Sequence, residues 1–339
     1  MKIDIFNHVF PKAFFDRYIT RGGKATDIVK RMANVPAIVD MDYRFRVMDE
    51  FGDVRQVITL GQPPLETMAP ATESPDIAVA ANDGLAEMVE RHPDRFIAFG
   101  ASLAMNNVDA CLKEIERASE QLGARGFLIY TNVAGRPLDA PEFAPLFAEI
   151  ARRDLVVFLH PARGSNIADY VTEQKSQYEI WWALGWPYET SAAMARMVFS
   201  GMFDRHPDLK VITHHMGGMI PYFAGRVGYG WDQLGVRTSD VDLGAVKDAL
   251  KKRPIDYFKQ FYADTALFGS AAATACGLDF FGVDRALFAS DMPFDPTPGL
   301  FLRETILAIE SLDLTAEAKE RIYRTNAERL LNIGAAATT

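Results

Sequence analysis

Histidines and one aspartate stand at the ends of short apolar runs and could together bind a divalent metal ion. His8 follows KIDIFN, His160 ends LVVFLH, His214 and His215 end LKVITHH, and Asp291 ends RALFASD. Imidazole and carboxylate groups are ordinary ligands of zinc and related ions, and catalytic zinc commonly keeps three protein ligands and an open position. A single histidine of this kind is more often a buried, hydrogen-bonded side chain, but their repeated position predicts a functional site.

The apolar runs are predicted β-strands, and amphipathic stretches predicted to be helices lie between them. The predicted strands are KIDIF, VRQVITL, RFIAFGA, GFLIY, LVVFLH, LKVITHH, QFYADT and RALFASD, which begin near residues 2, 54, 95, 126, 155, 209, 260 and 285. This βα alternation favours an α/β fold with a parallel sheet, and its length fits a (β/α)8 TIM-type barrel. A doubly wound sheet stays open, although no GxGxxG follows the first strand.

A barrel brings the C-terminal ends of all its strands to one mouth, so the histidines that end strands and Asp291 are expected to meet there. His92 and His206 stand before strands, in RHPDRF and RHPDLK, and we interpret both as structural. We expect one domain over residues 1–335, with irregular insertions near residues 20–45 and 161–190. Long connections after barrel strands usually build the active site.

Composition argues against several other classes of protein. The net charge of -9 disfavours non-specific binding to nucleic acid, which needs basic patches. The two cysteines have no CxxC spacing, which argues against a disulfide framework and a thiolate zinc site. We see neither a signal peptide nor an apolar run of about 18 residues, so we expect a cytoplasmic protein without a membrane partner.

The order of these motifs resembles the ACMSD-like branch of the amidohydrolase superfamily, named for aminocarboxymuconate semialdehyde decarboxylase. MKIDIFNHVFP, FLHP, WPYETS, FDRHPDLKVITHHMGGMIPYFAGR, FYADTA and FASDMPF follow the family's pattern over nearly the whole chain. The resemblance implies a distorted (β/α)8 barrel with a small inserted segment, usually dimeric. It implies one divalent metal ion, zinc first and manganese second, and the decarboxylation of a small aromatic or unsaturated carboxylic acid.

The resemblance also implies roles for residues at the mouth. His8, His160 and Asp291 match the metal ligands. His215 matches the histidine near the metal, so His215 and Asp291 are the candidate general acid and base. His214 is then expected to be out of phase with its neighbour and to face away from the site.

The substrate is expected to carry a carboxylate, and several side chains could hold it. Arg226 matches an arginine that reaches a neighbouring subunit's site, where a bidentate guanidinium suits a carboxylate; a surface salt bridge is the alternative. Arg163, two residues after Pro161, is a second candidate, with a loop cap as its alternative. Trp186 could wall an aromatic pocket, or pack in the core. A further anchor could be Arg31, Arg44 or Arg46, and the sequence does not choose among these three.

Phe6 departs from the family's pattern, which has His-x-His or Glu-x-His in the first strand. A phenyl ring cannot bind the metal, and Asn7 points to the opposite face of the strand. In one alternative, the remaining ligands hold the metal and Phe6 packs against the substrate or seals the site floor. In the other, the metal is lost and acid–base groups act alone. We favour the first, because the other ligand positions are intact.

Three functions therefore stay open. The leading one is a metal-dependent lyase that decarboxylates a small acid. The second is a metal-dependent hydrolase of a ring, lactone, ester or amide, which would use the same residues but a metal-bound water as nucleophile. The third is a catalytically silent ligand-binding barrel. Phe6 favours this last alternative, whereas the retained ionisable groups at one mouth weigh against it.

Overall fold

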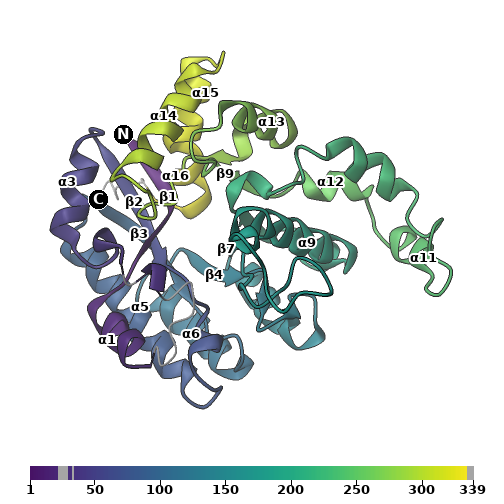
Figure 1. Cartoon of the computed structure of the whole chain (residues 1–339), viewed down its shortest axis with the longest axis horizontal. Coiled ribbons are helices and arrows are strands. Elements are labelled where there is room, and N and C mark those ends of the chain that lie inside the picture. The colour runs from purple at the N-terminus through teal and green to yellow at the C-terminus, as the bar shows by residue number, and fades with distance from the viewer. Residues whose placement is uncertain (22–29, 33, 334–339) are drawn as a thin grey trace.

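Eight parallel strands form a nearly closed barrel in the computed structural model (Figure 1). The structure describes residues 1–21, 30–32 and 34–333. The strands, in their order around the sheet, are β1 (Lys2–Val9), β2 (Val54–Leu60), β3 (Phe96–Ser102), β4 (Gly126–Tyr130), β7 (Val156–His160), β8 (Lys210–Thr213), β9 (Tyr262–Asp264) and β10 (Ala286–Leu287). The TIM-type barrel is confirmed, and each predicted strand is found at its predicted place.

The barrel closes between β1 and the chain that follows β10. The backbone N–H of His8 donates to the carbonyl oxygen of Met292 over 2.8 Å. The backbone N–H of Asp291 donates to the carbonyl oxygen of Phe6 over 3.0 Å. The predicted last strand, RALFASD, is regular only over Ala286–Leu287. Its remaining residues still follow β1 closely enough to bring Asp291 beside the first strand from the other end of the chain.

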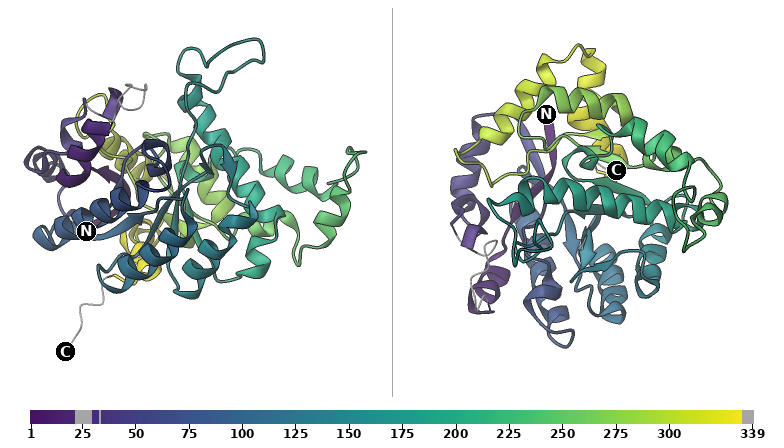
Figure 2. Two further views of the ribbon diagram at one scale, coloured as in Figure 1. Left: turned by 90° about the horizontal axis from the view of Figure 1, so that it is seen from below. Right: turned by 45° about the vertical axis from the view of Figure 1, so that its right-hand side comes forward.

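Helices surround the barrel and follow the predicted βα alternation (Figures 1 and 2). They are α1 (Lys12–Arg21), α3 (Met41–Asp49), α4 (Leu65–Met68), α5 (Ser74–Arg91), α6 (Val108–Glu120), α7 (Ala144–Arg152), α8 (Ile180–Ala183), α9 (Gly185–Phe199), α10 (Met202–Arg205), α11 (Leu243–Asp248), α12 (Pro254–Phe258), α13 (Ala271–Phe281), α14 (Leu300–Ser311), α15 (Ala316–Glu320) and α16 (Asn326–Leu331). Helix α6 shows the common pattern: it buries Cys111, Ile115 and Ala118, which share one face of a helix. Over the described residues, no helix is long and apolar enough to cross a membrane.

The connections on which we expected irregular structure differ in detail from the prediction. Residues 161–179 form neither helix nor strand, but α8 and α9 begin inside the predicted insertion at 161–190. A teal loop of this region stands out from the body of the molecule in the left view of Figure 2. Of the predicted insertion at 20–45, residues 22–29 and 33 lie outside the described residues, and the rest includes a 3-10 turn and the start of α3.

Arg44 on α3 joins β1 to β2 beneath the barrel mouth. The side chain is fully buried, and burial lowers the pKa of its guanidinium to about 10, so it remains charged at neutral pH. It donates to Gln56 Oε1 over 2.8 Å, to Asn7 Oδ1 over 2.6 Å and to the backbone carbonyl of His8 over 2.7 Å. Because its N–H donors are used inside the protein, Arg44 has a structural role. It is therefore not the substrate anchor.

Candidate metal centre and active site

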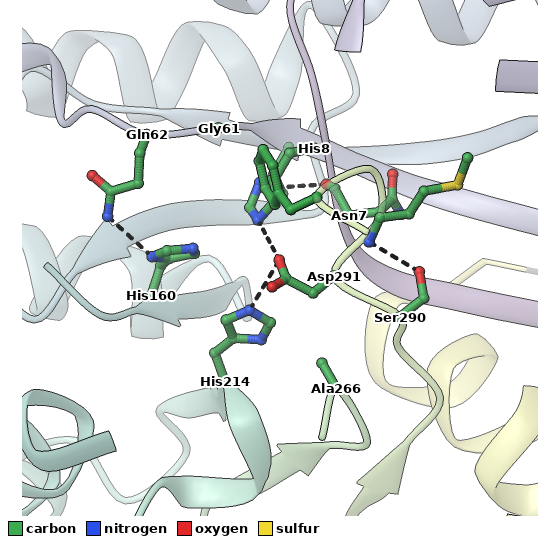
Figure 3. A network of polar contacts seen from close by, with 12 residues as sticks. Asn7, His8, Gly61, Gln62, His160, His214, Ala266, Ser290 and Asp291 are labelled. Atoms are coloured by element: carbon green, nitrogen blue, oxygen red, sulfur yellow. Dashed lines mark hydrogen bonds and ion pairs between the residues drawn. The ribbon is translucent and has the colours of Figure 1, made fainter. Parts of the chain in front are cut away.

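Three imidazole rings and one carboxylate converge at the C-terminal ends of the strands (Figure 3). Oδ1 of Asp291 lies 3.3 Å from Nε2 of His8 and 3.5 Å from Nε2 of His214. His160 completes the group, because one ring nitrogen from each of the three histidines lies within 4.8 Å of the others. All four side chains are buried.

The hydrogen bonds of the three rings fix which nitrogen carries a hydrogen. Nδ1 of His8 and Nδ1 of His160 each face a backbone carbonyl oxygen at 2.7 Å, and Nδ1 of His214 contacts the carboxylate of Asp264. Carbonyl and carboxylate oxygens accept hydrogen bonds, so Nδ1 must donate in each ring. In the neutral ring Nε2 then presents a lone pair, as a metal ligand requires.

The atoms at the centre of the group face one another, but none of them makes a hydrogen bond to a described residue. Nε2 of His8, Nε2 of His214 and Oδ1 of Asp291 are buried and make no hydrogen bond to any residue that the structure describes. Leaving one buried polar atom unpaired costs about 1–3 kcal/mol. A divalent cation would satisfy these atoms together, and nitrogen and oxygen donors suit zinc and manganese. The residues present therefore fit a metal ion.

The electrostatics of the group agree with this fit. Burial alone would raise the pKa of Asp291, but His214, His215 and His8 hold that pKa well below its usual range. Burial and the neighbouring imidazoles lower the pKa of His160 well below its ordinary value. The site therefore combines an ionised carboxylate with a neutral imidazole, which are the forms that bind a metal.

The prediction that His214 faces away from the site is wrong. Strand β8 ends at Thr213, and the next residues turn sharply, with φ of +53° at His215 and +52° at Met216. The two-residue alternation of a strand therefore does not extend through the histidine pair. Both rings face the mouth, and Nε2 of His215 lies 3.6 Å from Oδ2 of Asp291.

Opposing effects act on the pKa of His214. Burial lowers this pKa, but the carboxylates of Asp264 and Asp291 outweigh burial and raise it to about 9. Without a metal, the two carboxylates therefore favour the protonated form of the His214 ring. Metal binding through this ring would require loss of that proton, since a histidine ligand must be deprotonated.

His215 has a different environment from its neighbour. Its backbone N–H donates to Oδ1 of Asp264 over 3.0 Å, but its ring Nδ1 is buried without a partner among the described residues. Burial and the adjacent His214 lower the pKa of His215, which favours the neutral ring. Gly218 allows this turn to pack closely, because a Cβ at its φ of +60° would meet the carbonyl oxygen of Pro187 at 2.3 Å.

A narrow cavity with aromatic walls adjoins the metal centre. The lining residues are Arg31, Met32, Gln62, His160, Trp182, Trp186, Phe268, Asp291 and Phe294. The guanidinium of Arg31 lies 5.1 Å from the ring of Trp182 and 5.6 Å from that of Phe294, and it donates to the backbone carbonyl of Phe294 over 3.3 Å. No carboxylate of the described residues pairs with it in an ion pair. The cavity therefore offers aromatic surfaces and a cation beside the metal ligands.

Comparison with known proteins identifies the family of this chain. A family model described as Amidohydrolase matches residues 3–333. The chain belongs to the amidohydrolase family. The match confirms the amidohydrolase superfamily that the sequence predicts.

Two curated relatives and one solved structure are similar to this amidohydrolase over most of its length. A 2-amino-3-carboxymuconate-6-semialdehyde decarboxylase from Dictyostelium discoideum is 31% identical over 258 residues, which are 76% of this chain and 67% of the relative. A gamma-resorcylate decarboxylase from Rhizobium radiobacter is 31% identical over 307 residues, or 86% and 87% of the two chains. The structure of a dihydroxybenzoic acid decarboxylase from Polaromonas sp., with bound manganese and the inhibitor 2-nitroresorcinol, has a TM-score of 0.77 at 25% identity and covers 98% of this chain and 96% of its own.

The remaining predicted residues of this amidohydrolase take different places. Trp186 lines the cavity, and its indole N–H donates to the backbone carbonyl of Arg163 over 3.2 Å. The guanidinium of Arg163 is paired with Glu189 at 2.9 Å and lies outside the lining. Phe6 is fully buried and forms part of the floor beneath the histidines. Arg226 is exposed at the start of a π-helix, away from the lining of its own cavity.

Sequence reasoning missed two polar residues of the site. Gln62 lies just beyond β2, lines the cavity and donates to the carbonyl oxygen of Pro161 over 2.7 Å. Asp264 is the last residue of β9 and contacts His214. Both stand at the C-terminal ends of strands, so the rule that selected His160 would also have selected them.

Proposed function

We propose that this amidohydrolase is a metal-dependent lyase that removes a carboxyl group from a small aromatic acid. One observation carries the proposal. Buried metal-binding atoms without hydrogen bonds to the described residues adjoin a cavity that has aromatic walls and the guanidinium of Arg31. The relatives named as decarboxylases support the reaction, and the aromatic acids in their names support the substrate class. A hydrolase has no comparable support among these relatives.

His8, His160 and Asp291 would hold the metal ion. The manganese bound in the Polaromonas enzyme makes manganese the first ion to test, and the donor set also suits zinc. When bound, the ion supplies a Lewis acid that polarises an oxygen of the substrate. We further propose that Phe6 occupies a position at which this branch of the family usually has a metal ligand.

The protein's own residues would orient the substrate and move the proton. The aromatic walls would hold the ring and exclude water, and Arg31 would hold a carboxylate. As the bond between the ring carbon and the carboxylate breaks, its electron pair stays on the carbon and CO2 leaves. The carbon then would take the N–H proton of the neutral His215 ring, while the other ring nitrogen of His215 accepts a proton from solvent. Asp291, 3.6 Å from His215, would orient the ring and assist the transfer.

Arg31→Gln tests the assignment of the carboxylate anchor. We expect the KM for the acid to rise by about 10–100-fold, with a smaller change in kcat, because a charge-assisted hydrogen bond contributes about 1.5–3 kcal/mol. Arg46→Gln is the matched control, since Arg46 is exposed on α3 and outside the cavity. Steady-state kinetics would contradict the assignment if both variants changed KM equally, or if neither did.

We also propose that the protein is a homodimer in which Arg226 reaches the partner's site. Several aromatic side chains are largely exposed in the single chain, including Tyr178 at 94% and Tyr222 at 80%. Exposed apolar surface of this kind is typical of interfaces. Light scattering after size-exclusion chromatography should give twice the 37.7 kDa mass of one chain. Tyr222→Asp should shift the protein toward monomer and Leu307→Asp should not; a wild-type monomer would exclude the dimer.

A further inference from the structure

We infer that His214 is a fourth protein ligand of the metal ion, and that Phe6 is the platform that holds its ring in place. The inference rests on the proposed metal dependence, but it does not depend on which reaction the metal supports. It assigns a role to the residue that the strand pattern had placed outside the site.

The position of the ring provides the first argument. Nε2 of His214 points at Oδ1 of Asp291 from the side opposite His8, as Figure 3 shows. The atom is buried and makes no hydrogen bond to a described residue. It also belongs to one group with nitrogens of His8 and His160. An ion held by those ligands would therefore lie within reach of His214.

The contacts of the other ring nitrogen provide the second argument. Nδ1 of His214 donates to Asp264, and a carboxylate behind a histidine is the usual outer partner of a metal-binding imidazole. This carboxylate is itself fixed, because its Oδ1 accepts from the backbone N–H groups of His215 and Ala266, each over 3.0 Å. The ring therefore has a set tautomer and a set direction before any ion arrives.

Phe6 provides the third argument. Its ring lies parallel to that of His214, with centroids 3.9 Å apart and 14° between the planes. The same ring is 5.8 Å from that of His160. A buried phenyl ring in this place donates nothing to an ion, but it prevents the imidazole from tilting away. Phe6 thus holds the ring of His214 in place, and His214 supplies the nitrogen ligand that position 6 lacks.

His215 is the competing candidate for the fourth ligand, because it also forms a group with His214 and Asp291. Its ring lacks the outer partner that sets a tautomer, since its Nδ1 has none among the described residues. Its Nε2 faces Oδ2 of Asp291 rather than Oδ1, around which His8 and His214 gather. A ring free to change its protonation suits proton transfer better than metal binding.

Metal affinity of single variants tests the inference. Apoprotein is titrated with Mn2+ against a fluorescent chelator, for wild type, His214→Ala and the matched control His215→Ala. We expect about one ion per chain in wild type and an affinity loss of at least ~100-fold in His214→Ala, because even outer partners of ligands contribute about 10–100-fold. His215→Ala should keep the affinity within about 3-fold. Wild-type affinity in folded His214→Ala would overturn the inference.

Two further measurements keep the test independent of folding and of function. The double variant Phe6→His/His214→Ala should regain metal affinity, because a donor returns on the same face as His8. X-ray absorption of the metal-loaded wild type should show three imidazole ligands, and two would overturn the inference. Absence of any binding by wild type would instead remove the proposed metal dependence itself, and this inference with it.

Discussion

Substitution of His160 by alanine is expected to remove both the bound metal ion and the lyase activity. His160 is the last residue of β7, and its Nδ1 is held at 2.7 Å by the backbone carbonyl of Pro161, which leaves Nε2 for the ion. Loss of a ligand lowers metal affinity and with it the Lewis-acid contribution, so kcat/KM should fall by at least about 10³-fold. Elemental analysis of the purified protein, together with steady-state kinetics, measures both effects.

The matched control for this variant is His206→Ala. His206 directly follows α10 and precedes β8 by four residues, at the end of the barrel opposite the mouth, and it takes no part in the metal group. This variant should keep both metal and activity. Retention of a full metal complement in His160→Ala would contradict the assigned site, and loss of activity in both variants would point to general damage.

Arg44→Met is expected to lower the free energy of unfolding by about 3–5 kcal/mol, the range found when one member of a buried charged network is removed. The buried guanidinium satisfies Asn7, Gln56 and two backbone carbonyls, and methionine would leave these acceptors without a donor. Urea denaturation measures the change.

Arg46→Met is the control for the stability prediction. Arg46 lies two residues further along α3 and is exposed, so its replacement should change the free energy of unfolding by less than about 0.5 kcal/mol. A loss below about 1 kcal/mol in Arg44→Met would show that the buried network contributes little net stability. A metal-binding defect in a folded Arg44→Met protein would instead show that Arg44 also supports the metal site, a role that its contacts do not indicate.

The barrel and the meeting of His8, His160 and Asp291 could be predicted because both depend on local patterns. Short apolar runs between amphipathic helices specify strands, and the barrel brings strand ends together wherever they lie in the chain. The position of Asp291 at the end of the last strand thus predicted that it lies beside the first strand, although it is 283 positions after His8 in the chain.

The orientation of His214 could not be predicted from the same pattern. Alternation of side chains holds only while the strand continues, and β8 ends one residue before this histidine. The stacking of Phe6 on His214 and the burial of Arg44 were also beyond reach, because they depend on packing between elements that are distant in the sequence. The cavity could not be predicted either, because its lining residues Arg31, Trp182 and Phe294 come from separate connections.

A metal ion at this mouth is expected to support the decarboxylation of an aromatic acid. The most direct test is the release of ¹³CO2 from a panel of carboxyl-labelled hydroxybenzoic acids, with apoprotein and with manganese-loaded protein. We expect CO2 and the decarboxylated arene in equal amounts from at least one acid, only in the metal-loaded sample. Equal release without metal, or cleavage of esters, lactones or amides in place of CO2 release, would contradict metal-dependent decarboxylation by this protein.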